Sequence, residues 1–518
     1  MTNSVVALPL GWAWTSLEEV AELKGGLTLG KKRGPHEHVR PVAYLRVANV
    51  QRGFLSLDEV KMIAATESEI EELCLRDGDI LFNEGGDRDK LGRGWIWSGE
   101  LPECIHQNHV FRARLRTPEI VPKLVSMYAN WFGQAYFLRN GKQTTNLASI
   151  NLKTLSKFPF PLPPANEQRR IVAKLEALLA RSRRAKDALG AIPALLEQFR
   201  QSVLAAAFRG DLTRDWRKAN PDVESASKLL ERIRVERRRR WEEAELKWMQ
   251  SRGKLPKDDR WKAQYIEPST PRRTELPPIP DSWSWATLPE LGELARGKSK
   301  HRPRNDPRLF GGPYPFIQTG DVARSRGRIT NAEQTLSDFG LAQSRLFPAG
   351  TVCITIAANI ADSAVLAIPA CFPDSVVGLI PDRNFASAEY VEFFIRTAKA
   401  DLAAFAPATA QKNINLEVLS EVAIPVPPPT ERLVVEARVA KALAAAQAIE
   451  EQVLALSGRC DALDSSVLTS AFRGELVPRD PTDEPASALI ERIRAQREMA
   501  EQQQMPARSK RRRETKVA

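Results

Sequence analysis

The sequence is poor in cysteine and has no long hydrophobic run. Its 518 residues include only five scattered cysteines, an odd number, which argues against a disulfide framework and favours a reducing compartment. No apolar run approaches the roughly 18 residues that a membrane-spanning helix needs. The first residues also lack the basic and apolar regions of a secretory signal. The sequence therefore predicts a soluble, cytoplasmic protein that has no contact with a membrane.

Several enzyme motifs are absent or incomplete. No Asn/Asp-Pro-Pro-aromatic stretch, with which an amino-methyltransferase grips its target base, occurs in the sequence. The stretch GELARGKS, from Gly292 to Ser299, fits the phosphate-loop pattern, but KHRPRNDP follows it and cannot form the helix that the loop requires. Asp222, Glu245 and Lys247 resemble a metal-dependent nuclease pattern, yet the last two are two residues apart on an arginine-rich helix and face different sides.

One group of metal-binding side chains is also incomplete. Cys104, His106 and His109 lie close together in the sequence, but no clear fourth ligand accompanies them. We therefore expect no catalytic residue, no metal site and no cofactor in this chain.

Basic residues outnumber acidic ones. The chain has 76 Lys and Arg against 64 Asp and Glu, a net charge of +12. Such an excess favours a polyanionic partner such as nucleic acid. The alternative is a basic surface that aids solubility, or a basic tail such as the RSKRRR stretch near the C-terminus.

The chain is a tandem repeat. Six stretches of the first half each match a stretch of the second: GWAWTSLEEVAELKGG with SWSWATLPELGELARG, YLRVANV with FIQTGDV, LRDGDILF with FPAGTVCI, SINLKTLSKFPFPLPPANEQ with NINLEVLSEVAIPVPPPTER, SVLAAAFRGDL with SVLTSAFRGEL, and ASKLLERIR with ASALIERIR. Repeats of this kind identify the architecture before any other feature. Two copies of one module therefore account for nearly the whole chain.

Each copy has a globular part followed by a helical part. The globular parts mix short β-branched runs with Gly, Pro and Asn turns, which predicts an α+β domain. A proline block then stops any helix from the globular side, and Asn166 and Thr430 are plausible N-caps of the helices that follow. We place Glu167 and Glu431 at the positive ends of those helices.

A heptad pattern runs through both helical parts. The apolar positions of the first copy are Ile171, Leu175, Leu178, Ser182, Ala185, Leu189, Ile192, Leu196, Phe199 and Val203, and those of the second copy are Val435, Val439, Ala442, Ala446, Ile449, Val453, Leu456, Cys460, Leu463 and Val467. Steps of four and three residues predict a coiled-coil seam. An amphipathic helix lying on its own domain is the alternative. Gly190 with Pro193, and Gly458, should bend or loosen the helices.

Two similar modules can pair about a pseudo-twofold axis, which would make the two long helices antiparallel. The predicted fold is thus an α+β tandem repeat with two globular domains joined by an antiparallel coiled coil. We expect these boundaries: 1–160 and 281–424 for the globular domains, 161–250 and 425–500 for the helical spacers, 251–280 for a linker and 501–518 for a disordered basic tail.

The proline-block openings, the FRGDL and FRGEL endings and the LLERIR and LIERIR repeats together resemble the DNA-specificity subunit of type I restriction-modification systems. The resemblance covers nearly the whole chain. It implies that the globular parts are target recognition domains that read the halves of a split, asymmetric site in double-stranded DNA. It also implies two methyltransferase subunits and motor/nuclease subunits as partners, which would bind S-adenosylmethionine, ATP and Mg²⁺ and perform adenine methylation and ATP-dependent cleavage.

Three other hypotheses stay open on the sequence alone. The chain could be the recognition subunit of a restriction system outside type I, a nuclease or NTPase with its own site, or a coiled-coil scaffold whose charge is incidental.

Reading bases requires Arg, Lys, Asn and Gln on loops that enter a groove, whereas phosphate contacts require only cations. The candidate DNA-binding residues are Lys31, Lys32, Arg33, Arg88, Lys90, Arg93, Lys142, Gln143, Asn146, Lys298, Lys300, Arg302, Arg304, Arg324, Arg326, Arg328, Gln411, Lys412 and Asn413. The alternative for any charged run is a solvated face. For docking of the methyltransferase, the resemblance points to Phe208, Arg209, Phe472 and Arg473 and to the run Arg237–Arg240.

Overall fold

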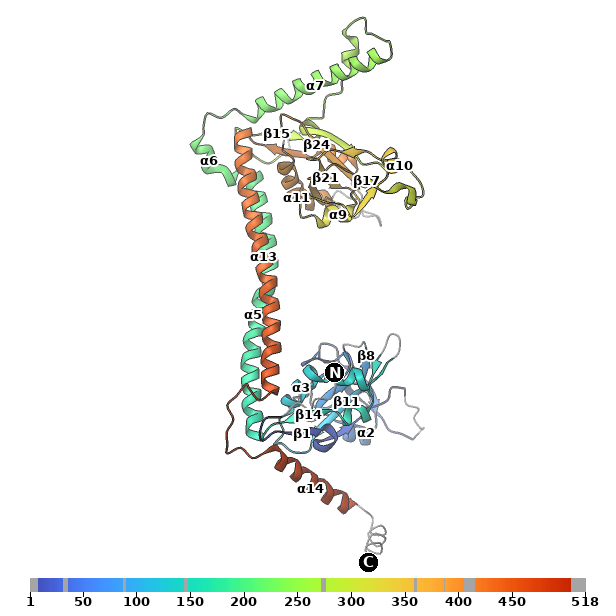
Figure 1. The fold of residues 1–518 in the computed structure, drawn as a ribbon, viewed down its shortest axis with the longest axis vertical. Helices are drawn as coiled ribbons and strands as arrows, with labels where there is room; N and C mark the ends of the chain where they lie inside the picture. Colours follow the sequence, from blue (N-terminus) through green and yellow to red (C-terminus); the bar gives the residue numbers. More distant parts are fainter. Residues whose placement is uncertain are drawn as a thin grey trace, which may run out of the picture. The chain divides into compact units, whose positions relative to one another are not determined.

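The chain divides into two compact units. The computed structural model describes residues 8–30, 36–86, 90–143, 148–271, 276–357, 361–385, 387–404 and 415–504. Unit 1 comprises residues 1–189 and 455–518, and unit 2 comprises residues 190–454. Each unit therefore combines a globular part with halves of two long helices, which are coloured by sequence in Figure 1.

Unit 1 contains two principal sheets and a strand pair. Its strands are β1 (Ala13–Ser16), β2 (Ala21–Lys24), β3 (Arg40–Leu45), β4 (Val50–Gln51), β5 (Phe54–Leu55), β6 (Lys61–Ala65), β7 (Ile80–Asn83), β8 (Gly85–Gly86), β9 (Gly94–Ile96), β10 (Cys104–His106), β11 (Val110–Leu115), β12 (Lys142–Gln143), β13 (Ala148–Ser149) and β14 (Pro159–Leu162). One sheet has the order β2-β11-β7-β9, the other has the order β10-β3-β6, and β1 pairs with β14. Small two- and three-stranded ribbons complete this part.

Unit 2 repeats this plan. Its strands are β15 (Ser284–Thr287), β16 (Gly292–Arg296), β17 (Phe310–Phe316), β18 (Arg328–Ile329), β19 (Gln334–Leu336), β20 (Leu346–Phe347), β21 (Val352–Thr355), β22 (Ser363–Leu366), β23 (Ala370–Cys371), β24 (Val376–Pro381) and β25 (Ala423–Val426). The sheets have the orders β16-β24-β21-β22-β18 and β19-β17-β23-β20, and β15 pairs with β25. In both units one sheet is antiparallel at its centre, and the other contains one parallel pair, β3 with β10 or β17 with β23. The predicted α+β tandem repeat is confirmed.

Helices cover these sheets and connect the two globular parts. They are α1 (Leu17–Val20), α2 (Glu67–Leu73), α3 (Pro122–Asn140), α4 (Leu152–Ser156), α5 (Ala165–Phe208), α6 (Arg214–Ala219), α7 (Ala226–Ser251), α8 (Leu288–Leu291), α9 (Thr319–Arg324), α10 (Asp338–Ala342), α11 (Ala388–Ala404), α12 (Leu416–Glu421), α13 (Pro429–Phe472) and α14 (Ala486–Gln504), with short 3₁₀ turns η2 (Asp211–Thr213), η3 (Asp259–Gln264) and η5 (Pro307–Leu309). No helix in the described stretches is both long and apolar enough to cross a bilayer.

The two long helices, α5 and α13, pair in opposite directions within each unit, as Figure 1 shows. In unit 1, Ile171 near the start of α5 clusters with Ala471 near the end of α13, and Lys186 farther along forms an ion pair with Asp464 at 2.7 Å. In unit 2, Arg200 pairs with Glu450 at 2.8 Å. The predicted antiparallel pairing is confirmed.

Burial varies along the heptad positions of both long helices without a regular trend. Val435 and Val439 are fully buried, whereas Leu456 and Leu463, which the heptad places in the seam, are 43% and 57% exposed. Both helices run unbroken through Gly190, Pro193 and Gly458. The pairing of two helices alone thus leaves part of the predicted seam uncovered.

Each long helix ends at the phenylalanine of a repeated FRG stretch, and that phenylalanine packs on a globular part. The Phe208 ring lies edge-on to Tyr390 and Phe394 of α11, with ring centroids 5.1 and 5.2 Å apart. The Phe472 ring packs in the same way on Tyr128 and Phe132 of α3, at 5.0 and 5.6 Å. Each phenylalanine therefore fixes one helix end to the globular part of its own unit.

The glycine two residues after each of these phenylalanines is required by the backbone conformation of the turn. Gly210 and Gly474 have φ angles of 76° and 72°, the left-handed region that favours glycine. A Cβ atom at either position would lie 2.5 Å from a proline Cγ, that of Pro280 or of Pro9. The turn therefore requires glycine in both copies.

A buried tryptophan also contacts the start of each long helix. The Trp12 indole N–H donates to Glu167 at 3.1 Å, and the Trp283 indole N–H donates to Glu431 at 2.9 Å. Burial raises the pKa of the Glu167 carboxyl. The helices begin at Ala165 and Pro429, so Asn166 and Thr430 are second residues of the helices and the N-cap prediction was wrong.

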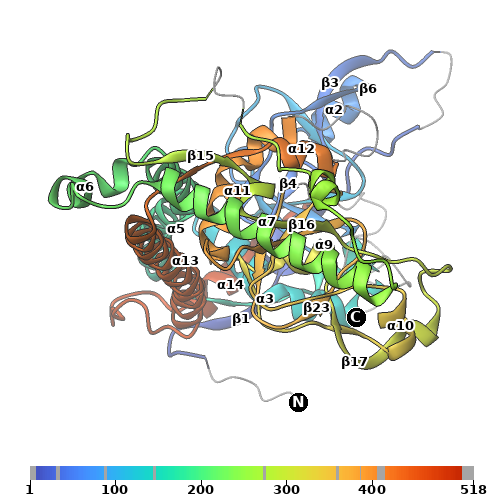
Figure 2. The same cartoon turned by 90° about the horizontal axis from the view of Figure 1, so that it is seen from above.

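The helices that follow the FRG turns pack on the globular parts. Leu229, Leu230 and Ile233 of α7 belong to the main core of unit 2, and Leu489, Ile490 and Ile493 of α14 belong to the main core of unit 1. Their arginines form matching ion pairs, Arg234 with Glu290 and Arg494 with Glu19. Figure 2 shows α7 passing over the region of β15 in unit 2. Among the described helices, α5 and α13 form the antiparallel pair. Residues 501–504 of the predicted tail lie in α14, and residues 505–518 lie outside the described residues.

Candidate nucleic-acid interface

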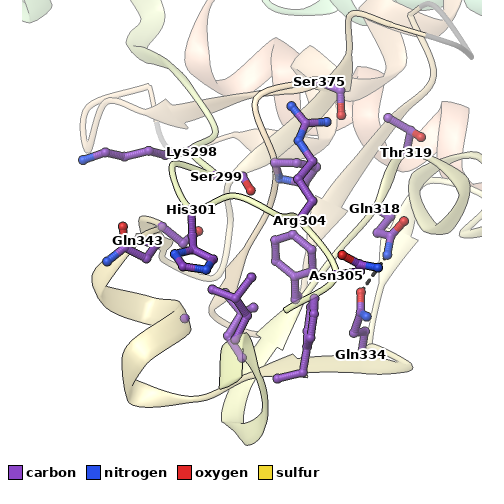
Figure 3. Close-up of a pocket in the computed structure, with 17 residues that line it drawn as sticks. Lys298, Ser299, His301, Arg304, Asn305, Gln318, Thr319, Gln334, Gln343 and Ser375 are labelled. Atoms are coloured by element: carbon purple, nitrogen blue, oxygen red, sulfur yellow. Dashed lines mark hydrogen bonds between the residues drawn. The ribbon is translucent and has the colours of Figure 1, made fainter. Parts of the chain in front are cut away.

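A cleft of about 590 Å³ opens in the globular part of unit 2. Its walls come from the loop after β16, from β17, α9, β19 and α10, and from the residues after β23. Cationic and amide side chains line it, as Figure 3 shows: Lys298, Arg304, Asn305, Gln318, Gln334 and Gln343. These are the residue types that bind phosphates and base edges. The cleft therefore has the chemistry of a nucleic-acid interface.

The Asp306 carboxylate links two side chains in the basic loop on one side of the cleft. Asp306 accepts hydrogen bonds from Arg308 at 2.8 Å and interacts with the His301 ring at 2.8 Å. The Arg308 guanidinium, the Arg308 backbone N–H and His301 together hold the pKa of Asp306 well below its usual range. The carboxylate therefore stays charged at neutral pH and links His301 to Arg308.

Four of the predicted residues lie on this loop. Lys298 and Lys300 are exposed, while their backbone N–H groups donate to Phe372 and Gln343 at 3.1 and 3.2 Å. Arg302 donates to two loop carbonyls, and Arg304 pairs with Asp374 at 3.2 Å. The backbone positions the two lysines and leaves their ammonium groups exposed.

A second basic turn carries Arg324, Arg326 and Arg328. The first pairs with Asp321 and the last with Glu389, whereas Arg326, with a φ of 52°, is exposed. Arg396 of α11 donates to the Arg326 carbonyl oxygen at 3.0 Å. An ion pair with a buried carboxylate therefore supports this turn, because the half-buried Arg396 in turn pairs with the buried Glu392 at 2.5 Å.

The described candidates in unit 1 are fewer. Lys142 is exposed on β12, where Gln143 also lies, and Lys90 and Arg93 are half-buried beside β8 and β9. Arg93 donates to the Val47 carbonyl oxygen at 3.4 Å. Of the unit 2 candidates, Lys298 and Arg304 line the cleft described above. The other candidates lie outside the described residues: Lys31, Lys32, Arg33, Arg88, Asn146, Gln411, Lys412 and Asn413.

The sequence interpretation missed the amides of the cleft. Gln318, Gln334 and Gln343 carry no charge and stand in no basic run, so charge patterning did not select them. Asn305 directly follows Arg304 in the basic run, where only the cations were selected. The signal that was available is the match of FIQTGDV with YLRVANV, which sets Gln318 opposite Arg46.

The residues predicted to dock a partner have mixed environments. Phe208 and Phe472 are buried within their own units, while Arg209 and Arg473 are exposed. Docking at these turns stays a prediction, and partner contacts there would come from the arginines. In the run Arg237–Arg240, Arg239 pairs with Glu236 and Glu243, and Arg240 pairs with Asp382. Carboxylates of this chain thus neutralise much of that run.

The incomplete enzyme motifs form no site in the described residues. GELARGKS begins as strand β16, and the next helical element after it is the short 3₁₀ turn at Pro307–Leu309. His106 is buried with its Nδ1 against the Val110 carbonyl oxygen at 2.6 Å, and burial lowers its pKa to about 4. Within the part of the chain that the structure describes, no three His, Cys, Asp or Glu side chains are grouped as a metal site.

A family model matches each copy of the repeat. The type I restriction modification DNA specificity domain matches residues 9–188 and again residues 280–455, which together exceed half of the chain. Each match ends inside one of the long helices, α5 or α13.

Three curated relatives match at 24–30% identity. The specificity subunit of the type I restriction enzyme EcoKI from Escherichia coli K12 is 30% identical over 42% of this chain and 47% of its own length, so this match spans about half of that protein. The EcoDI specificity subunit from Escherichia coli is 26% identical over 75% of this chain and 80% of its own length. The EcoBI specificity subunit from Escherichia coli is 24% identical over 96% of this chain and 94% of its own length.

Two solved structures share the fold. A structure from work on complex assembly and conformational transition of the type I restriction-modification system covers 91% of this chain and all of its own, with a TM-score of 0.62 and 18% identity. The crystal structure of the HsdS subunit from Thermoanaerobacter tengcongensis covers 92% of this chain and all of its own, with a TM-score of 0.53 and 18% identity.

Proposed function

The chain belongs to the family of type I restriction modification DNA specificity proteins, and we propose that each of its units reads one half of a split site in double-stranded DNA. The cleft of unit 2 carries this proposal, because it combines cations for phosphates with amides for base edges. The two copies carry different side chains in equivalent loops. We therefore expect an asymmetric site whose halves differ in sequence.

We propose that two methyltransferase subunits dock on the paired helices and that motor/nuclease subunits complete the complex. Several large apolar side chains of these helices are exposed to solvent: Leu195, Phe199, Ile449 and Leu454 in unit 2, and Leu456 and Leu463 in unit 1. Exposed apolar rows of this kind fit amphipathic helices of a partner. The solved structure from work on type I complex assembly supports this proposal.

The chain itself acts as a non-catalytic reader. S-adenosylmethionine, ATP and Mg²⁺ would be bound by the partner subunits, which would methylate adenine and cleave DNA. Purified chain should therefore show neither ATPase nor nuclease activity; either activity in a preparation free of partner subunits contradicts this assignment.

Mapping methylated adenines tests the main proposal. DNA from cells that express this chain with its methyltransferase subunit should carry a two-part motif with a fixed gap. DNA from cells that express the methyltransferase alone is the control and should lack it. A continuous motif, or no motif in the presence of both subunits, contradicts the proposal.

A further inference from the structure

Two glutamines face each other across a corner of the unit 2 cleft. Gln318 lies just after β17 and before α9, and Gln334 begins β19, the antiparallel neighbour of β17. The Gln318 side-chain N–H donates to the Gln334 side-chain oxygen at 2.6 Å, the bond drawn in Figure 3. Gln318 is exposed and Gln334 is half-buried. One amide therefore holds the other at the open side of the cleft.

The main chain at Gln318 is fixed on both sides. Its backbone N–H donates to the Asp321 carboxylate at 2.8 Å, and its carbonyl oxygen accepts the Asp321 backbone N–H at 3.0 Å. The side chain consequently starts from one defined backbone position. Little conformational entropy remains to be lost when the amide binds a ligand, which favours a specific contact.

The remaining hydrogen-bonding groups of Gln318 match one base. A glutamine amide has two N–H donors and one carbonyl acceptor, and one donor is already used by Gln334. One N–H donor remains, and the carbonyl oxygen, which faces the Asp321 backbone N–H in a capping box, keeps a second lone pair. A donor and an acceptor are the pair that adenine N7 and the adenine N6 amino group require in the major groove. Guanine presents two acceptors there, so the Gln318 carbonyl oxygen would face O6 without a proton between them.

Resting on the proposed function, we propose that Gln318, held by Gln334, is a specificity-determining residue of unit 2 that reads an adenine base edge in the major groove. The amide is neutral and displaces no counterions, so it contributes to discrimination between bases rather than to general DNA affinity. Lys298 and Arg304 in the same cleft supply the charge.

The equivalent position of unit 1 carries an arginine. In the matched stretches YLRVANV and FIQTGDV, Arg46 stands opposite Gln318 and Asn49 stands opposite Asp321. The Arg46 backbone N–H donates to the Asn49 side-chain oxygen at 2.9 Å, the same turn that fixes Gln318. One nitrogen of the Arg46 guanidinium donates to the Glu59 carbonyl oxygen at 3.2 Å and lies 3.5 Å from the Glu59 carboxylate. The remaining N–H donors of the guanidinium match guanine O6 and N7. The two units would thus read different bases from one backbone position.

Exchanging the two side chains tests the proposal. In cells that carry the full complex, Gln318→Arg should change one base pair of one half-site from A·T to G·C and leave the gap and the other half unchanged. Arg46→Gln should produce the opposite change in the other half-site. Gln264→Arg, at an exposed glutamine on η3 outside both the cleft and the paired helices, is the matched control and should leave the motif intact.

A binding measurement decides the case if Gln318→Arg abolishes methylation. The purified complex with Gln318→Ala should lose about 5- to 150-fold discrimination at one base pair in a panel of substituted duplexes and keep it at all others. Uniform weakening across the panel, or an unchanged motif with Gln318→Arg, overturns this assignment alone. A wild-type complex that methylates no split motif overturns the proposed function itself.

Discussion

Units 1 and 2 attach the long helices to their globular parts through nearly identical contacts, called joints below, but the polar groups around those joints differ. Both bury the phenylalanine of an FRG turn on two aromatic rings of a globular helix, and both pair a buried tryptophan with a glutamate. Around these joints the partners differ. In unit 2, Glu431 accepts hydrogen bonds from Thr213 at 2.6 Å and from Arg217 as well as from Trp283. In unit 1, the described hydrogen bond to the Glu167 side chain comes from Trp12.

A second difference lies between the two aromatic rings of each joint. Tyr128 and Phe132 take the places of Tyr390 and Phe394, so Asn130 corresponds to Glu392. Asn130 exchanges two hydrogen bonds with the backbone of Gly94, at 2.7 and 3.0 Å. Glu392 instead pairs with Arg396, which supports the basic turn at Arg326. The repeat therefore keeps its packing and varies its polar contacts, one of which lies beneath candidate DNA-binding residues.

The largest expected effect is on the joints themselves. Phe208→Ala and Phe472→Ala should each lower the free energy of unfolding by about 3–5 kcal/mol, because a buried aromatic side chain is lost and a cavity remains. Hydrogen exchange during denaturation should locate the loss in unit 2 for the first variant and in unit 1 for the second. Phe199→Ala, at an exposed position, is the control. Equal loss in both units from either variant would show that the joints do not act separately.

A smaller effect should distinguish the tryptophans. Trp12→Phe removes the indole donor of a buried carboxylate and should cost about 1.5–3 kcal/mol, the range for a hydrogen bond to a charged group. Trp283→Phe should cost less, because Thr213 and Arg217 still donate to Glu431. Chemical denaturation of both variants measures the difference. Equal costs would mean that the extra donors of unit 2 do not compensate.

Unit 2 should also respond to pH through a buried carboxylate that has no counterpart at the equivalent position of unit 1, where Asn130 stands. Burial raises the pKa of Glu392 from the ordinary 4.5 to about 7, against the opposing effect of Arg396. The folded state therefore binds a proton that the unfolded state releases, so this stabilisation is complete below pH 4.5 and is lost as pH rises through 7. Unfolding followed between pH 4.5 and 8 should show this slope, and Glu392→Gln should flatten it. Glu389→Gln, at an exposed carboxylate on the same helix, should retain the slope; a slope that survives Glu392→Gln assigns it to another group.

The smallest effect concerns general DNA affinity. Lys298→Ala and Lys142→Ala, at one exposed cation in each unit, should weaken binding evenly across sequences and reduce the slope of log K against log salt by about 1 each. Titrations at several salt concentrations measure it. Gln318→Ala should leave the slope unchanged, since the amide is neutral. A sequence-dependent effect of Lys298→Ala would mean that this lysine contacts a base.

Much of the architecture could be predicted because the same module occurs twice in the sequence. The repeat, the long helices and their antiparallel pairing follow from apolar spacing and matched motifs, which depend on local sequence. The role of Phe208 could not be predicted, because its partners on α11 lie about 180 residues later in the chain. Nor could the Gln318–Gln334 pair, which depends on the register of β17 and β19. The arginines at 237–240 were selected on the resemblance, and the fold shows that Asp382, far away in the sequence, pairs with Arg240.

The joint at Phe472 has a consequence for synthesis. Unit 2 is one continuous stretch, so it can assemble as soon as residue 454 has left the ribosome. Unit 1 begins first but is completed last, because its core includes Leu489, Ile490 and Ile493 and its α3 is covered by Phe472. The globular part made first must wait, with its aromatic helix α3 uncovered, until nearly the whole chain has been translated. A ribosome that stalls after unit 2 would thus release a chain in which unit 2 is complete and unit 1 still lacks α14 and the contact of Phe472 with α3.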